Sequence, residues 1–330
     1  MWRLVATILV VGGVLSSYAQ QQITLPNKNG TVKFAVIGDS GTGGGAQKKI
    51  ADRIATSRQA FPFEFVIMLG DNLYGRERAG DYAEKFERPY KPLLDAGVKF
   101  YASLGNHDDP EQRLYKPFNM NGQRYYSFKP SLLADVRFFA LDSNYMDQKQ
   151  LEWLEKELAA SGSDWKIAFC HHPLYSSGGR HGSDVVLRQQ LEPLFVRYGV
   201  NVVFTGHEHF YERVKPQNGI TYFISGSAAK LRRGDIEKSD LTAKGYDQGY
   251  TFMVVEIDGD QLHFQSITEN GQTVDSGVVL REKRAPQKTA KYHPRPAQGS
   301  RIGNRLPKDG TLRAAGLRPA GAQLPLKVTS

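Results

Sequence analysis

The sequence predicts an α/β fold built on mixed β-sheet, and three observations support this prediction. Short apolar runs alternate with amphipathic stretches as far as residue 205. Strand and turn patterns then follow without helices. The chain of 330 residues is 40% hydrophobic and 23% charged, so it can bury a sizeable core. Alternating strands and helices favour parallel pairing, whereas strands joined by short turns favour antiparallel pairing.

The first part of the chain supplies the alternating elements. Six apolar runs have the length and composition of buried strands: 32–38, 65–70, 98–104, 136–141, 165–170 and 200–205. Amphipathic stretches between them predict four helices: 46–60, 81–96, 151–160 and 185–198. Asp147, followed three residues later by Gln150, predicts a capping box at the start of the third helix.

The pattern changes after Gly219. Four further strands are predicted at 221–225, 250–257, 261–268 and 273–280. The last three are separated by Asp258-Gly259 and Asn270-Gly271, and such pairs are typical of hairpin turns. One domain is therefore expected to end near residue 283.

The N-terminus has the features of a secretory signal. Arg3 is followed by an apolar run over residues 4–15, and small residues lead to a cleavage site predicted after Ala19. We therefore predict a signal peptide over 1–19, a short linker over 20–30 and a catalytic domain over 31–283. A cleaved protein would be secreted or periplasmic, with no remaining transmembrane segment. An uncleaved membrane anchor is the alternative, because the run is strongly apolar.

The positive charge lies at the C-terminus. Residues 284–330 contain ten Lys and Arg against one acid, Asp309, which accounts for the whole formal net charge of +9. This Pro- and Gly-rich stretch has no periodicity, so we predict a disordered tail that contacts anionic surfaces or serves as a solvated linker. Because the rest of the chain is neutral overall, no specific nucleic-acid partner is expected.

Polar residues follow five of the predicted strands. Six of the eight histidines lie in or just beyond these segments, counting His181. The carboxyl ends of parallel strands are where α/β sheets bind ligands. Carboxylate, imidazole and amide groups suit divalent or trivalent metals, and an Asp can bridge two of them. The segments are Gly38-Asp39-Ser40-Gly41, Gly70-Asp71-Asn72, Gly105-Asn106-His107-Asp108, His171-His172-Pro173 and Gly206-His207-Glu208-His209.

The order of these motifs resembles that of the calcineurin-like metallophosphoesterases. Tyr74, three residues after Asp71, narrows the resemblance to the purple acid phosphatases, and most closely to their small tartrate-resistant type. The resemblance covers about residues 31–283. It implies an α/β/β/α sandwich in which two mixed β-sheets are flanked by helices.

The resemblance also implies a binuclear metal centre with Asp71 as the bridge. The first site would hold Fe(III), and the second would hold Fe(II), Zn or Mn. A Tyr74 phenolate would offset the additional charge of a ferric ion. His171 is preferred to His172 because the family motif is H-x-P. The first set of ligands is Asp39, Asp71, Tyr74 and His209, and the second is Asp71, Asn106, His171 and His207.

The implied function is that of a secreted acid phosphatase acting on small phosphate monoesters. A metal-bound hydroxide would attack phosphorus in line with the leaving group. His107 and His181 would hold the phosphate and protonate the leaving group. One alternative is a metallophosphodiesterase or nucleotidase with two divalent metals and Tyr74 as a bystander. A second alternative is a non-catalytic secreted binding protein with the same fold. A third is a protein that binds anionic polymers through its tail.

Overall fold

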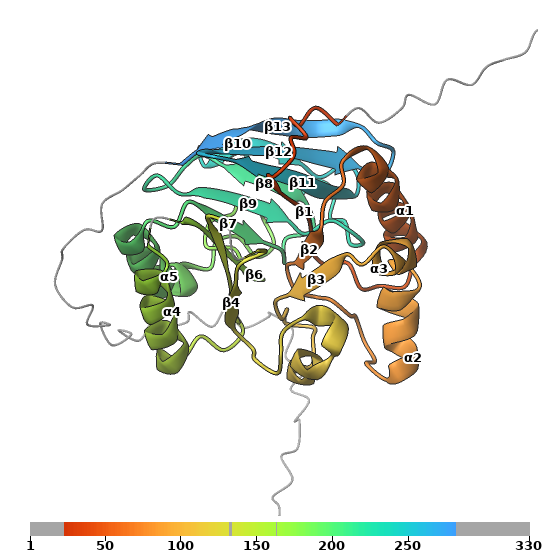
Figure 1. Cartoon of the computed structure of the whole chain (residues 1–330), viewed down its shortest axis with the longest axis horizontal. Coiled ribbons are helices and arrows are strands. Elements are labelled where there is room, and N and C mark those ends of the chain that lie inside the picture. The colour runs from red at the N-terminus through yellow and green to blue at the C-terminus, as the bar shows by residue number, and fades with distance from the viewer. Residues whose placement is uncertain (1–22, 132–133, 163, 282–330) are drawn as a thin grey trace, which may run out of the picture. The chain divides into compact units, whose positions relative to one another are not determined.

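The computed structural model describes residues 23–131, 134–162 and 164–281, and Figure 1 shows how their elements are arranged. Two mixed β-sheets lie face to face, with α1 and α3 beside the first and α4 and α5 beside the second. The expectation of two mixed sheets flanked by helices is confirmed. The predicted signal peptide (1–19) and basic tail (284–330) lie outside the described residues.

The first sheet, called sheet A, has six strands in the order β13-β12-β11-β1-β2-β3. β1, β2 and β3 pair in parallel, whereas β11, β12 and β13 pair antiparallel. The predicted hairpin turns at Asp258-Gly259 and Asn270-Gly271 join the last three strands, as expected. The strands are β1 (Val32–Ile37), β2 (Phe65–Met68), β3 (Lys99–Ala102), β11 (Thr251–Asp258), β12 (Gln261–Thr268) and β13 (Thr273–Leu280).

The second sheet, called sheet B, has seven strands in the order β10-β8-β9-β7-β6-β5-β4. β5, β6, β7 and β9 are parallel, and β4, β8 and β10 pair antiparallel. The strands are β4 (Tyr126–Phe128), β5 (Val136–Ala140), β6 (Trp165–Cys170), β7 (Val202–Thr205), β8 (Tyr211–Val214), β9 (Thr221–Ser225) and β10 (Thr242–Tyr246). The sequence patterns did not predict β4, β8 or β10, which are short or carry glycine and charged residues.

Three of the four predicted helices form as expected. They are α1 (Gly45–Ala60), α4 (Gln148–Ala160) and α5 (Val185–Tyr198). Asp147 caps α4 by accepting a hydrogen bond from Gln150 N, but the reciprocal half of the predicted capping box is absent. The Gln150 side chain instead accepts from Asp142 N at 2.8 Å, tying α4 to the end of β5.

The predicted helix over 81–96 is wrong as one continuous element. Pro89 lacks the N–H that a helix interior requires, and it lies where the helix is broken. The segment consists of a short α2 (Ala79–Tyr82), a π-helical turn (Ala83–Glu87) and α3 (Lys91–Asp95). Two 3₁₀ turns, Pro110–Leu114 and Lys116–Phe118, follow β3.

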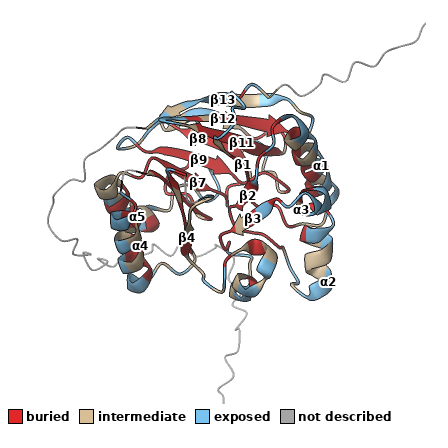
Figure 2. Ribbon diagram, in the orientation of Figure 1, coloured by how far each residue is buried: buried red, intermediate tan, exposed pale blue. Residues whose placement is uncertain are grey.

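The packing of the core explains why the strands of sheet B are continuous apolar runs in the sequence. Phe138 of β5 packs between the two sheets, while its neighbour Phe139 packs against the leucines of α4 and α5. Successive strand residues point to opposite faces, and both faces here are covered. Figure 2 shows the central strands as buried throughout. Cys170 is buried in the cluster that faces α4 and α5, as a small core residue.

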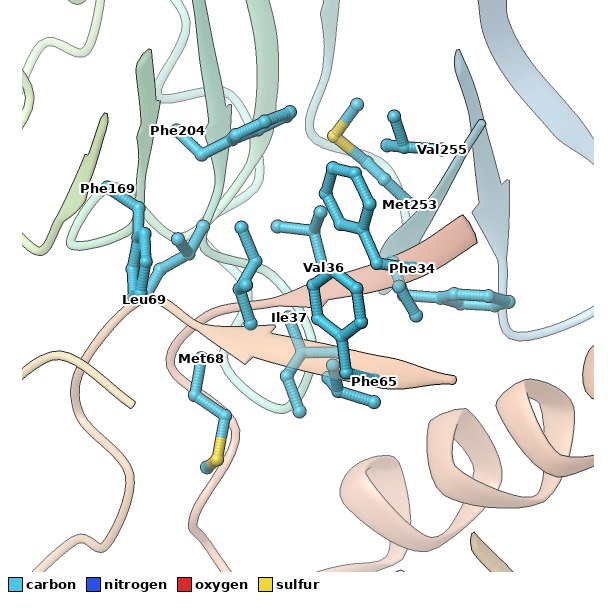
Figure 3. Packing of buried hydrophobic residues seen from close by; sticks show 14 of the residues in the cluster. Phe34, Val36, Ile37, Phe65, Met68, Leu69, Phe169, Phe204, Met253 and Val255 are labelled. Atoms are coloured by element: carbon cyan, nitrogen blue, oxygen red, sulfur yellow. The ribbon is translucent and has the colours of Figure 1, made fainter. Parts of the chain in front are cut away.

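Phe34 of β1 joins the two sheets at the centre of the core. Its ring stacks on Phe65 at 5.2 Å and meets Phe138 and Phe204 of sheet B edge to face, at 5.2 and 6.1 Å. Figure 3 shows this packing around Phe34, Phe65 and Phe204.

Within the described residues, the helices lack the length and apolar character of a membrane span.

Phe34→Ala should destabilise the domain by about 3 to 5 kcal/mol, because the fully buried ring leaves a cavity between the sheets. Urea unfolding would measure the change. Val278→Ala on β13, where the side chain is half exposed, is the matched control and should alter stability by less than about 0.5 kcal/mol. Equal losses in the two variants would contradict this description of the core.

Candidate metal centre

The two sheets each contribute part of one site at the carboxyl ends of their parallel strands. Sheet A supplies Asp39 after β1, Asp71 and Tyr74 after β2, and Asn106 after β3. Sheet B supplies His171 after β6, and His207 and His209 after β7. The sandwich brings these ends to a common edge, so residues far apart in sequence meet there.

The four residues predicted for the first metal site come together. Asp39, Asp71 and His209 each offer a ligand atom within 4.8 Å of the others. The Tyr74 hydroxyl lies 3.1 Å from Asp39 Oδ1 and 3.4 Å from His209 Nε2. His209 Nε2 is in turn 3.3 Å from Asp39 Oδ1. Three oxygen groups and one imidazole thus converge.

The residues predicted for the second site meet beside the first. His171 Nε2 lies 2.9 Å from Asn106 Oδ1 and 3.0 Å from His207 Nδ1. It is also 3.5 Å from Asp71 Oδ1. Asp71 therefore touches both groups, which is the position that a bridging carboxylate requires.

The hydrogen bonds of His171 make this arrangement fit a cation. Its Nδ1 lies 2.9 Å from the Leu69 carbonyl oxygen, which can only accept, so Nδ1 carries the proton. Nε2 is left with its lone pair directed at Asn106 Oδ1, another acceptor. Two lone pairs facing each other repel unless a positive ion lies between them. A histidine held through its second nitrogen is also typical of metal ligands.

Burial adds a second reason to expect positive charge. Asp39 and Asp71 are completely or almost completely buried. Burial and the neighbouring Asp71 raise the pKa of Asp39 well above its ordinary value. The same burial lowers the pKa of His207 to about 2 and that of His209 to about 3, so both imidazoles stay neutral and keep a lone pair for a metal. Oxygen and imidazole donors without sulfur suit iron, zinc or manganese.

Tyr74 also depends on a cation if it is to ionise. Burial, together with the negative charges of Asp39 and Asp71, raises the pKa of the Tyr74 phenol. Without added positive charge, a phenolate would face two buried carboxylates. A phenolate at this position therefore requires a metal ion of high charge beside it.

The backbone is strained at three of the predicted ligands. Asp39, Asp71 and His207 have φ values of +55°, +49° and +68°, in the left-handed region that non-glycine residues rarely adopt. Each such residue costs about 1 to 3 kcal/mol and persists where the surrounding structure enforces it. A Cβ on Gly105 would overlap the backbone nitrogen and side chain of Asp71, so only glycine fits there.

Asp108 holds two of the ligand loops together. Its carboxylate accepts hydrogen bonds from Gly105 N at 2.8 Å, Leu73 N at 3.0 Å and Asn72 N at 3.1 Å. The loops after β2 and β3 are thereby fixed relative to each other. Asp108 lies beside the predicted ligands without joining either group.

His172 lies beside the second group but is held differently from His171. One of its ring nitrogens is within 4.8 Å of ligand atoms on His171 and His207. Its Nδ1 lies 2.9 Å from Ser143 Oγ, and it lines a separate polar cavity with Ser143. His171 is completely buried and makes the contacts to Asn106 and Asp71, so its geometry favours it as the ligand.

The two imidazoles predicted to act in catalysis line the cavity above these groups. The cavity has a volume of about 410 Å³. The His107 ring lies 5.0 Å from that of Tyr74, and the His181 ring lies 4.3 Å from that of His207. Each candidate proton donor therefore stands beside one of the two ligand groups.

Three cations of the cavity wall were not predicted from the sequence. Arg180, Lys230 and Arg232 line the same cavity. Arg232 Nη2 is 3.2 Å from His181 Nε2, and its Nη1 pairs with Glu208 at 3.1 Å. The sequence feature that could have revealed two of them is the basic segment from Lys230 to Arg233. It lies shortly after the end of β9, as the five predicted polar segments follow their strands.

A sandwich of two mixed sheets with two neighbouring groups of possible metal ligands at one edge is typical of the metallophosphoesterases. Residues 32–211 match the family described as calcineurin-like phosphoesterase. The chain belongs to this family and is a phosphoesterase, a hydrolase. The sandwich of two mixed sheets flanked by helices, which the resemblance implied, is the fold observed for this member of the family.

Comparison with individual proteins shows which phosphoesterases the chain resembles. The chain is 28% identical to tartrate-resistant acid phosphatase type 5 of Rattus norvegicus over 302 residues, which cover 77% of this chain and 92% of the relative. It is 26% identical to purple acid phosphatase 7 of Arabidopsis thaliana over 293 residues, covering 78% and 89%. Among solved structures, GAP50, the anchor in the inner membrane complex of Plasmodium, has the same fold with a TM-score of 0.68 at 17% identity, covering 77% and 90%.

The choice between the adjacent histidines can be tested by metal content. His171→Ala should reduce bound metal from two ions per chain to about one, because it removes a predicted ligand. His172→Ala is the matched control and should retain two ions, with at most about a tenfold weaker affinity. Elemental analysis of purified, metal-loaded protein would measure both. Loss of metal in His172→Ala alone would reverse the assignment.

Proposed function

We propose that the protein is a secreted acid phosphatase that hydrolyses phosphate monoesters at a binuclear metal centre. The observation that carries this proposal is the sharing of Asp71 between two ligand groups beneath a cavity lined by His107 and His181. The similarity to purple and tartrate-resistant acid phosphatases supports the same substrate class.

The ligands are assigned as the motifs predict. Asp39, Asp71, Tyr74 and His209 would hold Fe(III), and Asp71, Asn106, His171 and His207 would hold Fe(II), Zn or Mn. Such a pair of ions supplies the Lewis acidity that activates a water and stabilises both oxygens of an in-line displacement. Asp108 and the Leu69 carbonyl keep the ligands at fixed positions during turnover.

His107 and His181 bind the phosphate and deliver a proton to the leaving oxygen. Burial, Arg232 and Arg180 lower the pKa of His181 below its ordinary value, so nearby negative charge would favour protonation of its ring. A phosphate dianion beside these residues offsets the two guanidinium groups and favours the protonated ring. An imidazole acid must be protonated to act, which fits activity at acidic pH.

Secretion is proposed from the N-terminal pattern alone. Arg3, the apolar run over residues 4–15 and the small residues before Ala19 support a cleaved signal peptide. Contact of the basic tail (284–330) with anionic surfaces is proposed from its charge.

Activity and colour together test the proposal. Metal-loaded protein should hydrolyse p-nitrophenyl phosphate at least about tenfold faster, in kcat/KM, than bis(p-nitrophenyl) phosphate, with a visible absorption band from the tyrosinate. Tyr74→Phe should lose the band. Asp71→Asn should lose about a thousandfold in kcat/KM, roughly 4 kcal/mol of transition-state stabilisation.

Tyr125→Phe is the matched control, because that ring packs on Trp153 and does not line the cavity. It should keep both the band and the activity. A preference for the diester, or full activity in a colourless, iron-free protein, would favour the alternative with two divalent metals. No hydrolysis of either ester would favour a non-catalytic binding protein.

A further inference from the structure

We propose that Glu208 is a positioning residue that holds the loop bearing His181 in place over the metal centre. Glu208 lies between the predicted ligands His207 and His209, and its side chain is completely buried. It is not itself one of the predicted ligands. The inference rests on the proposed function, in which His181 acts on the phosphate and the leaving group.

His181 needs support from outside its own side chain. The residue is exposed, so packing in the core does not fix its position. It lies in the loop that joins β6 to α5, and that loop contains Gly178, Gly179 and Gly182. Glycines allow a backbone many conformations. A ring that must meet a leaving oxygen therefore requires fixed points close to it in the loop.

Glu208 provides such fixed points on both sides of His181. Gly182 N, directly after His181, donates a hydrogen bond to Glu208 Oε1 at 2.7 Å. Before His181, a Cβ on Gly178 would overlap the Glu208 carboxylate, so the loop backbone packs directly on it. The loop is thereby tied to the segment that carries two of the predicted ligands.

Arg232 extends this support from Glu208 to the His181 ring. Its Nη1 donates to Glu208 Oε2 at 3.1 Å, and its Nη2 lies 3.2 Å from His181 Nε2. A guanidinium can only donate, so Nε2 of the neutral ring accepts, and this contact orients the ring. Arg232 N also donates to the His209 carbonyl oxygen at 3.0 Å. The contacts thus run without a break from the ligand segment to the ring.

The support depends on both oxygens of the carboxylate. One oxygen accepts from Gly182 and the other from Arg232. An amide has a single acceptor oxygen, so a glutamine at this position could satisfy only one of the two donors. Arg232 would keep Asp235 as an ion-pair partner at 3.3 Å. Glu208→Gln should therefore preserve the fold and loosen the loop.

The leaving group of the substrate tests this role. p-Nitrophenolate departs readily without a proton, whereas phenolate is more basic and depends more on protonation. Glu208→Gln should lower kcat/KM by about thirtyfold for phenyl phosphate and by less than about threefold for p-nitrophenyl phosphate. In a His181→Ala background, the same substitution should change neither value further, because the two residues act as one unit.

Amide hydrogen exchange measures the loop without turnover. In Glu208→Gln, exchange over residues 176–183 should be faster by about tenfold, while elemental analysis of the metal-loaded protein still finds two ions per chain. The matched control is Glu237→Gln, which removes the same charge from an exposed side chain close to Gly179 of this loop. It should leave exchange, metal content and both kcat/KM values unchanged.

Two sets of results would overturn the proposal. Equal losses for the two esters, or a loss of bound metal, would mean that Glu208 acts through His207 and His209 rather than through His181. Unchanged kinetics and exchange would mean that the loop does not depend on Glu208. In both cases the wild type still hydrolyses monoesters. Failure of the proposed function is distinguishable, since it would abolish hydrolysis in the wild type itself.

Discussion

The structure depends on two buried carboxylates placed close together. Asp39 and Asp71 offer oxygens within 4.8 Å of each other, with almost no exposure to water. At an effective dielectric constant of about 20, two such charges repel by roughly 3 to 4 kcal/mol. Protonation would relieve the repulsion, and so would a cation. The neutral imidazoles around them favour the cation, because each keeps a lone pair directed into the same space.

The rest of the fold serves to hold this unfavourable arrangement in place. Parallel strands from both sheets end at one edge, and Phe34 and its aromatic neighbours lock the sheets face to face. Left-handed backbone at Asp39, Asp71 and His207 turns their side chains inward. Gly105 allows its strand end to approach Asp71 without a clash. The core thus supplies the stability that offsets strain and repulsion at the site.

Much of this could be predicted from the sequence because it depends on local pattern. The strands that carry predicted ligands are apolar and mostly buried, so their ends could be located in the sequence. The polar residues directly after those ends could then be identified as candidate ligands. The strand β8 was missed because it has only four residues, two of them charged, and β10 was missed because it is partly exposed and carries Gly245. The broken helix near Pro89 could have been anticipated from that proline.

The site itself was predicted in part. Motif order identified the residues that converge, but the sequence could not show that Leu69 orients His171, because a backbone carbonyl has no sequence signature. It also gave no reason to separate Arg232, which pairs with Glu208, from Lys230, which forms no ion pair with the residues that the structure describes. Such distinctions depend on which carboxylates the fold brings within reach.

Anomalous diffraction from crystals of the metal-loaded protein tests the central claim most directly. We expect two anomalous peaks about 3.5 to 4 Å apart, one beside Tyr74 and one beside Asn106, with an Asp71 oxygen reaching each. At least the Tyr74 peak should appear at the iron edge. A single peak, or two peaks that do not share Asp71, would contradict the account.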